Sequence, residues 1–500
     1  MLVSIKALIV VLLIGWVCFR LLEPIMAEVQ DPEEFASWKK IWYLMIIAGF
    51  LAPNFWVLVL LIILVIRNSM PTDQRQRPLY YILLLCVLPI TFSEIPGFGG
   101  IRFIIRLDYP MLLAVLLLAS IHQMSKTAVP MYGMKSDKYI MLFILFNSLL
   151  VFRDDSVTNA LRQVVYIVLG VYLPYFVISR NLLDKEQFKR LFCIILIVAL
   201  PLSVIACFES AKHWLLFNAL PVAQQGFAQT PNYLARGGSL RATGVFSSPI
   251  GLGYFLVIAI GAWLYLRQAT TQKKRISLIG IILFIGLIAT FSRGPWLGLA
   301  VLWVVFIWSG RAAIKHYLKA AFLATLLLPV VMITPQGEKI INLLPGVADD
   351  TESAGSVDYR QKLIEQSWLV FQKKPLFGDR HYRDSPEMQV MQQGQGIIDV
   401  VNSYIHIALS TGLIGLFLFC TIFIGLLLAL YKQTKLLRES QPDLALMARV
   451  LLAVLSAMLF IIATVSSVGH IPYIYWAFSG VAAGFIYMDK ERSSASNVKI

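Results

Sequence analysis

Long apolar stretches recur along almost the whole 500-residue chain and constrain its fold more than any other feature. The hydrocarbon core of a bilayer is about 30 Å thick, and a helix of about 20 apolar residues crosses it. Candidate spans of this kind lie near residues 4–22, 41–66, 79–97, 107–124, 138–152, 160–179, 188–208, 244–266, 276–291, 294–310, 316–334, 401–431, 444–467 and 470–488. Because every backbone polar group needs a partner inside lipid, we predict an all-α fold, a polytopic membrane bundle of about 12–14 transmembrane helices.

The composition excludes a soluble globular protein. Hydrophobic residues make up 58% of the chain and charged residues only 14%, so polar groups could not cover its apolar surface. The net charge of +15 would suggest a nucleic acid partner for a soluble chain, but in membrane proteins lysine and arginine collect in the cytoplasmic loops. We therefore expect the lipid bilayer, and no nucleic acid, as the partner of this charge pattern.

The basic residues of the loops determine the expected topology. They cluster around Lys6, in segments 67–77, 125–138, 180–190, 267–275, 311–319 and 432–438, and around Lys490. With fourteen spans, all of these places fall on one side of the membrane, which the positive-inside rule makes cytoplasmic. Both termini are then cytoplasmic, whereas segment 27–40 and the loop 335–400 face outward. The apolar run after Lys6 resembles either a signal peptide or a signal anchor, and we favour the anchor because so many spans follow.

The topology predicts four regions and a single large loop. The regions are N-terminal transmembrane helices at 1–235, a transmembrane core with the RATG and SRG motifs at 236–334, the large outward loop at 335–400 and C-terminal transmembrane helices at 401–500. Within the loop, apolar residues recur at helical spacing ahead of a PLFG turn: Leu363, Trp368, Leu369 and Phe371. This pattern predicts an amphipathic helix that lies over the mouth of the bundle.

Three arginines on the expected outer face stand out because of their neighbours. Arg241 opens the segment RATGVFSSPIGLGY, Arg293 lies in FSRGPWLGL, and Arg360 begins the amphipathic helix. A guanidinium group keeps its charge and presents a fork of donors, which suits phosphate oxygens. Each arginine could instead be an interfacial anchor that reaches the lipid headgroups. For Arg293 we favour a site, because the Gly-Pro pair that follows it breaks the helix beside it.

The order of four motifs resembles the O-antigen polymerase and ligase superfamily, which includes exopolysaccharide polymerases. The motifs are RATGVFSSP, FSRGPWLGL, an arginine followed by PLFGD, and NSYIHIALSTGLIGL, between about residues 240 and 430. The resemblance implies a metal-independent, cofactor-free glycosyltransferase at the periplasmic face of a bacterial inner membrane. It also implies that arginines hold the undecaprenyl pyrophosphate of a lipid-linked sugar donor. Arg293 and Arg360 match the functional arginines of the family, and Arg241 is a weaker third match.

The chain departs from the family at one position. Members often carry a histidine directly before the Asn of NSYI, the proposed base of the ligases, and here that residue is Val401. Three nearby residues are possible substitutes: Asp399, His406 and His381. We favour Asp399 as the catalytic base, because it lies where the outer loop approaches the membrane; the alternative is a dissociative displacement that needs little help from a base. His406 is equally compatible with a satisfied histidine inside a span.

The last polar residues of this motif are expected to serve the acceptor or the helix. Asn402 and Tyr404 either position the acceptor sugar or cap the helix that begins there. The outward segments contain no Asp-x-Asp or histidine-rich signature of a metal site. We therefore predict that the site contains neither metal nor cofactor.

Three functions remain open at this point. The first is a polymerase that joins undecaprenyl-pyrophosphate-linked oligosaccharide repeats onto a growing polysaccharide, with or without a flippase and a chain-length regulator. The second is a ligase that passes the finished glycan to lipid A–core or to a protein, and the valine at position 401 favours the polymerase over it. The third is a non-catalytic transporter of polysaccharide or lipid-linked sugar. A transporter should carry charges at the midplane of several spans, whereas the candidate charges here gather at one face.

Overall fold

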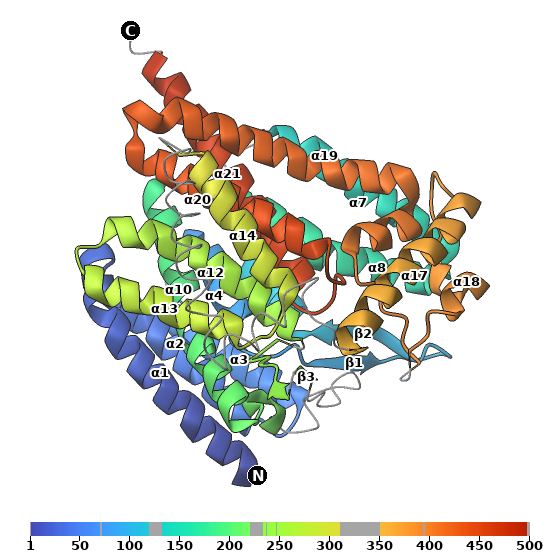
Figure 1. Cartoon of the computed structure of the whole chain (residues 1–500), viewed down its shortest axis with the longest axis horizontal. Helices are drawn as coiled ribbons and strands as arrows, with labels where there is room; N and C mark the ends of the chain where they lie inside the picture. The colour runs from blue at the N-terminus through green and yellow to red at the C-terminus, as the bar shows by residue number, and fades with distance from the viewer. Residues whose placement is uncertain are drawn as a thin grey trace.

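The computed structural model describes residues 2–70, 73–119, 133–220, 234–236, 238–246, 248–310, 351–393 and 396–497. Helices dominate this part of the chain (Figure 1), which confirms the predicted all-α membrane bundle. Seven helices there are long and apolar enough to cross a membrane: α1 (Leu2–Val29), the run Val157–Asn181, α10 (Lys185–Lys212), α12 (Pro249–Ala269), α19 (Ser403–Ser440), α20 (Pro442–Ile462) and the first part of α21 (Ile471–Asn497).

The other elements are shorter or more polar. Three of them are apolar helices below the usual spanning length: α3 (Phe55–Ser69), α5 with η2 (Tyr109–Leu113 and Ala114–Ala119) and α14 (Arg293–Trp308). The remaining helices are α2 (Pro32–Leu51), η1 (Gln74–Gln76), α4 (Arg77–Leu85), α7 (Lys135–Asp154), η4 (Leu216–Ala219), α13 (Lys273–Ile288), α17 (Thr351–Lys373), η5 (Tyr382–Asp384) and α18 (Pro386–Gln389). The run Val157–Asn181 comprises α8 (Val157–Ile167), η3 (Val168–Tyr172) and α9 (Leu173–Asn181). The expected span 316–334 lies outside the described residues.

The single span expected at 41–66 is wrong, because two helices occupy this segment. Helix α2 ends at Leu51 and α3 begins at Phe55. Between them Pro53 has no backbone N–H to continue the helical ladder. Asn54 then starts the next helix, since its side chain accepts a hydrogen bond from the backbone N–H of Val57 at 3.0 Å. The hydropathy profile does not reveal this break, because the residues on both sides of it are equally apolar.

The span expected at 79–97 is also wrong in its second half. Helix α4 ends at Leu85, and the chain then enters strand β1 (Phe92–Pro96). This strand pairs antiparallel with β2 (Phe103–Asp108), so that Glu94 lies opposite Arg106. A second pair of short strands, β3 (Ala235–Arg236) and β4 (Ser239–Leu240), precedes the RATG segment. Both hairpins belong to connections between helices.

The expected side of the N-terminus is wrong relative to the basic loops. Glu28, at the end of α1, accepts hydrogen bonds from the Thr270 hydroxyl at 2.6 Å and from the Thr271 backbone N–H at 2.8 Å. Glu34 forms an ion pair with Arg190 at 2.8 Å. Segment 27–40 therefore lies beside the basic segments 180–190 and 267–275, not opposite them. Since a 28-residue helix is about 42 Å long, Lys6 lies toward the other end of the bundle.

The extra helix explains this error. Splitting 41–66 into α2 and α3 adds one crossing, so the chain reaches segment 67–77 from the other side. The basic loops themselves still gather: Lys185 pairs with Asp443 at 2.7 Å, and Arg438 donates to the carbonyl of Ser309 at 3.0 Å. Figure 1 shows the α12–α13 turn and the C-terminal end of α21 at the left, and the β1–β2 hairpin, α17 and α18 at the right. We call these the basic end and the hairpin end.

Helix α12 lies at the centre of the bundle and supports the hairpin end. It packs against α10, α13, α14 and α20, and almost every side chain from Pro249 to Leu266 is buried. Glycines allow close helix contacts here: a Cβ on Gly253 would lie 2.7 Å from the Pro295 ring of α14, and one on Gly261 would lie 2.1 Å from Val454 of α20. The start of α14, which carries Arg293, is thereby held against the buried helix α12.

The large loop is anchored in a break of α19. Helix α17 ends before the predicted turn, and the residues that follow dock at Gly412, where the backbone leaves helical geometry (φ 68°, ψ −168°). The backbone N–H of Leu413 donates to the carbonyl of Pro375 at 2.7 Å, and that of Asp379 donates to Leu409 at 2.7 Å. Amides freed by the break thus find partners in the loop, and the break fixes α17 relative to the bundle.

Candidate functional site

The RATG segment and the SRG hinge meet at the hairpin end. The Nη2 atom of Arg241 donates to the Ser292 hydroxyl at 3.0 Å, and its Nε donates to the carbonyl of Thr290 at 3.4 Å. The backbone N–H of Ala242 donates to the carbonyl of Ala289 at 3.1 Å. Two motifs about 50 residues apart therefore form one structure, with Arg241 next to the residue that precedes Arg293.

The hinge between α13 and α14 presents Arg293 at a helix start. Helix α13 ends at Ile288, and Phe291 adopts a left-handed backbone (φ 45°) before α14 begins at Arg293. Gly294 packs closely against the turn after α20. A Cβ on Gly294 would lie 2.4 Å from the hydroxyl oxygen of Thr464 in that turn. The first turn of a helix carries backbone N–H groups without helical partners and the positive end of the helix dipole. Arg293 adds a full positive charge at the same place.

Arg360 joins this group from the large loop. It lies on α17, and the loss of surrounding water, together with the positive charge of Arg293, lowers the pKa of its guanidinium. The carboxylate of Asp399 opposes this shift and raises the pKa. The three charges therefore act on one another across α14, α17 and the end of the loop. No ion pair of Arg360 is found within the described ranges.

Asp399 is held between the loop and the turn after α20. The Ser466 hydroxyl donates to its Oδ1 atom and to the carbonyl of Val400, the latter at 2.9 Å. The hydroxyl of Tyr359, the residue before Arg360, donates to the backbone carbonyl of Asp399 at 2.9 Å. Asp399 is partly exposed, so one side of the carboxylate remains open. The predicted catalytic residues Arg293, Arg360 and Asp399 thus come together.

Asn402 and Tyr404 serve the helix and its packing. The side chain of Asn402 accepts hydrogen bonds from the backbone N–H groups of Tyr404 at 2.9 Å and Ile405 at 3.2 Å, so it caps α19. The Tyr404 hydroxyl donates to the carbonyl of Leu459 in α20 at 3.0 Å. Of the two roles expected for this pair, the structure shows capping by Asn402, and Tyr404 ties α19 to α20.

His406 is bonded to a tyrosine of the loop. Its Nδ1 atom lies 2.8 Å from the hydroxyl of Tyr382, which is buried. This is the arrangement of a satisfied histidine, one of the two expectations for His406. The contact also ties the first turns of α19 to η5.

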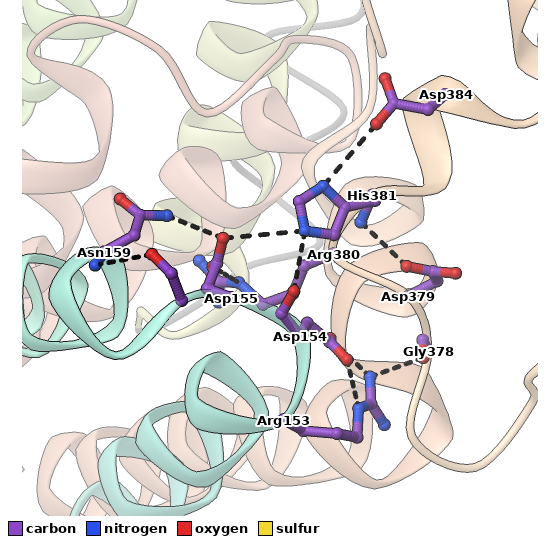
Figure 2. Close-up of polar contacts among 10 residues, drawn as sticks. Arg153, Asp154, Asp155, Asn159, Gly378, Asp379, Arg380, His381 and Asp384 are labelled. Carbon is purple, nitrogen blue, oxygen red and sulfur yellow. Dashed lines mark hydrogen bonds and ion pairs between the residues drawn. The ribbon is translucent and has the colours of Figure 1, made fainter.

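His381 lies in a different group of charges, shown in Figure 2. Its Nε2 atom is 3.2 Å from the carbonyl of Asp154 and 3.7 Å from a carboxylate oxygen of Asp155. Arg380 lies 3.8 Å from a carboxylate oxygen of Asp155. The Nη2 atom of Arg153 donates to a carboxylate oxygen of Asp154 at 2.6 Å and to the carbonyl of Gly378 at 3.0 Å. We call this group, which fastens loop residues 378–384 to the α7–α8 turn, the loop clamp. His381 is thus part of the clamp, and its contacts do not include the three arginines.

Several residues of the site were missed by the sequence analysis. Ser466 lies in TVSSVGH, a polar run between the last two expected spans, which is a usable signal for an outer turn. Tyr359 directly precedes Arg360, and Tyr382 directly follows His381. Nothing in the local sequence distinguishes these tyrosines from interfacial ones. Only the approach of the loop to α19 and α20 gives them partners.

The arrangement has the charge pattern of a site for a phosphorylated substrate. Arg241, Arg293 and Arg360 bring three guanidinium groups to one end of the bundle, and the carboxylate of Asp399 acts on Arg360. Guanidinium groups bind phosphate oxygens through paired hydrogen bonds. A partly exposed carboxylate beside them can accept a proton.

Two comparisons relate the chain to known proteins. A family model described as O-antigen ligase matches residues 278–420, the stretch that contains Arg293, Arg360 and Asp399. A protein of Salmonella muenchen named O-antigen polymerase is 21% identical over 309 residues, which is 61% of this chain and 76% of that protein. These matches and the multi-pass helical fold agree with the motif order noted in the sequence. The chain is similar to members of the O-antigen polymerase and ligase superfamily of membrane proteins.

Proposed function

We propose that the protein joins undecaprenyl-pyrophosphate-linked oligosaccharide repeats into an O-antigen or exopolysaccharide at the periplasmic face of a bacterial inner membrane. The observation that carries the proposal is the meeting of Arg241, Arg293, Arg360 and Asp399 at the hairpin end. The basic loops at the other end are cytoplasmic by the positive-inside rule. The site then faces the periplasm, where the large loop 335–400 also lies.

The proposed reaction is a displacement at the anomeric carbon of the donor. A hydroxyl oxygen of the acceptor sugar forms the new glycosidic bond, and the bond from the anomeric carbon to the pyrophosphate oxygen breaks. The pyrophosphate leaves with the bonding electron pair, so negative charge grows on it in the transition state. The three arginines stabilise that charge, and Asp399 takes the proton of the acceptor hydroxyl. Atoms and charges balance without a metal or a cofactor.

The predicted regions receive distinct roles in this proposal. The core at 236–334 supplies Arg241 and Arg293, and the loop at 335–400 supplies Arg360 and Asp399. The first helices of 401–500 support the loop through the break at Gly412. The N-terminal helices, 1–235, build the membrane scaffold, and β1–β2 extends it at the hairpin end.

A ligase is the second candidate, and the family model carries that description. A ligase would use the same donor but pass the whole glycan to lipid A–core or to a protein. The polymerase is preferred because Val401 occupies the position where ligases of the family often carry a histidine. The similar Salmonella protein is also named a polymerase.

Purified full-length protein, incubated with lipid-linked oligosaccharide repeats in the presence of EDTA, tests the proposal. We expect a ladder of products that differ by one repeat, and release of undecaprenyl pyrophosphate in equal number to the bonds formed. Transfer to lipid A–core without a ladder would identify the ligase instead. A strict requirement for a divalent ion would contradict the metal-free mechanism, and absence of any transfer would contradict the enzyme.

A further inference from the structure

Glu209 is a buried carboxylate whose contacts lead to the RATG loop. It lies in the last turn of α10, and its side chain has an exposed fraction of 0%. Its Oε2 atom accepts hydrogen bonds from the backbone N–H groups of Thr243 at 3.0 Å and Gly244 at 2.9 Å. Its Oε1 atom accepts from the backbone N–H of Leu216 at 3.0 Å. One carboxylate therefore holds both the segment after α10 and the loop that carries Arg241.

The local geometry of the loop suits an anion. Gly244 has a left-handed backbone (φ 53°), and two successive N–H groups point to the same carboxylate oxygen. Concave turns of this kind bind anions through backbone dipoles. Within the described residues no cation pairs with Glu209, so these three N–H groups are what compensates its burial. Hydrogen bonds to an ionised group are roughly twice as strong as those between neutral groups.

The loop is held from two opposite directions. On one side, the backbone N–H of Ala242 donates to Ala289 of the hinge, and the Arg241 side chain reaches Ser292. On the other side, Glu209 binds the next two backbone N–H groups along the chain. Removal of the second attachment would free the backbone of Thr243 and Gly244, so that this side of the loop loses its anchor. The direction of its guanidinium depends on both attachments.

We propose that Glu209 is a positioning residue for Arg241. Through Thr243 and Gly244 it fixes the backbone of the RATG loop, so that the guanidinium of Arg241 stays beside the start of α14 and within reach of a pyrophosphate. This inference rests on the function proposed above, because it gives Arg241 a ligand to meet. Glu209 itself does not touch the substrate.

A double-mutant cycle on the full-length protein tests the inference. The probe is undecaprenyl pyrophosphate, titrated against the detergent-solubilised protein and its variants Glu209→Gln, Arg241→Gln and the double variant. We expect each single variant to raise the dissociation constant about tenfold, the order expected for loss of one charged hydrogen bond. The double variant should bind no more weakly than Arg241→Gln alone, since both changes remove the same contact. Where Glu209→Gln fails to fold, Glu209→Asp replaces it, because a shorter carboxylate cannot reach Leu216 and the loop together.

The matched control is Asp108→Asn, at a partly buried carboxylate of the hairpin end that also accepts two hydrogen bonds. Asp108 accepts hydrogen bonds from the Met111 backbone N–H at 2.8 Å and the Tyr473 hydroxyl at 2.7 Å, away from the RATG loop. This variant should bind the probe like the wild-type protein.

Three results would overturn the inference. Wild-type affinity in Glu209→Gln would show that the loop does not need the carboxylate. Equal weakening by Glu209→Gln with and without Arg241 would show a general structural effect instead of positioning. Wild-type affinity in both Arg241→Gln and Arg293→Gln would remove the pyrophosphate site itself, and the role of Glu209 with it.

Discussion

Two groups of arginines lie at the hairpin end, and their partners differ. In the loop clamp, Arg153 and Arg380 face the adjacent carboxylates of Asp154 and Asp155. At the site, Arg241 donates hydrogen bonds to a hydroxyl and a carbonyl. The pKa of Arg360 is lowered by Arg293 and raised by Asp399.

The difference distinguishes arginines that join two parts of the chain from arginines that can bind a ligand. An arginine whose charge is already balanced by a carboxylate has little left to offer a ligand, and the clamp joins two elements of the chain. At the site, the positive charge of Arg293 lowers the pKa of Arg360, and two neighbouring positive charges favour the binding of an anion between them. We therefore expect the arginines of the loop clamp to stabilise the fold, and Arg293 and Arg360 to bind the substrate.

The sharpest test of this comparison substitutes one arginine of each group. Arg360→Gln should reduce polymer formation by about 1,000-fold, the order found when a transition-state negative charge loses one of its hydrogen-bond donors. Arg380→Gln should retain activity within about threefold, since its ion pair with Asp155 is long at 3.8 Å and lies in the loop clamp, outside the site. The measurement is the rate of repeat addition by purified protein at equal amounts of inserted protein. Full activity of Arg360→Gln, or loss of activity in Arg380→Gln alone, would break the comparison.

The carboxylates of the two groups should differ in the same way. Asp399→Asn should reduce the rate of repeat addition by about 100-fold, because general base catalysis contributes at least that order, while binding of undecaprenyl pyrophosphate stays intact or tightens. Asp384→Asn, a change at the exposed edge of the loop clamp, is the control and should leave the rate unchanged. Comparable rates in both variants would mean that the acceptor proton goes elsewhere, for example to solvent.

The docking of the loop into α19 should matter more for stability than for chemistry. Gly412→Ala places a Cβ 2.3 Å from the backbone carbonyl of Leu376 at a position with φ 68°. Backbone strain and overpacking together should cost about 3 kcal/mol, seen as a lower midpoint of thermal unfolding in detergent. Gly425→Ala on the same helix is the control, since its Cβ would meet nothing within 4 Å. Equal midpoints for the two variants would show that the break is not a fixed contact.

Asp108 offers a smaller test at a carboxylate that accepts hydrogen bonds from two neutral groups. Burial raises the pKa of Asp108 to about 6, although hydrogen bonds from Met111 and Tyr473 oppose the shift. Because the folded state then holds the proton at a higher pH than the unfolded state, stability falls as pH rises from about 4 to 6. The expected change is about 1 to 2 kcal/mol, measured as the midpoint of thermal unfolding across this range. Asp108→Asn should flatten that dependence, and an unchanged slope would contradict it.

Some features of this protein follow from the sequence alone, because they depend on local chemistry. Runs of apolar residues determine that the chain forms membrane helices, and the basic residues between them predict which loops gather at one end. The cap of α19 was among the roles expected for Asn402, since capping depends only on the next few residues. The order of the arginine motifs pointed to the superfamily without any knowledge of their arrangement.

Other features were decided only by tertiary structure. The break at Pro53 and the position of the N-terminus depend on contacts such as Glu28 with Thr270, which join residues far apart in the chain. Hydropathy could not reveal them, because it averages over a window and records no partner. Glu209 is a further example, since its local sequence resembles an ordinary helix end. Its three hydrogen-bond donors become visible only when α10, its following segment and the RATG loop pack together.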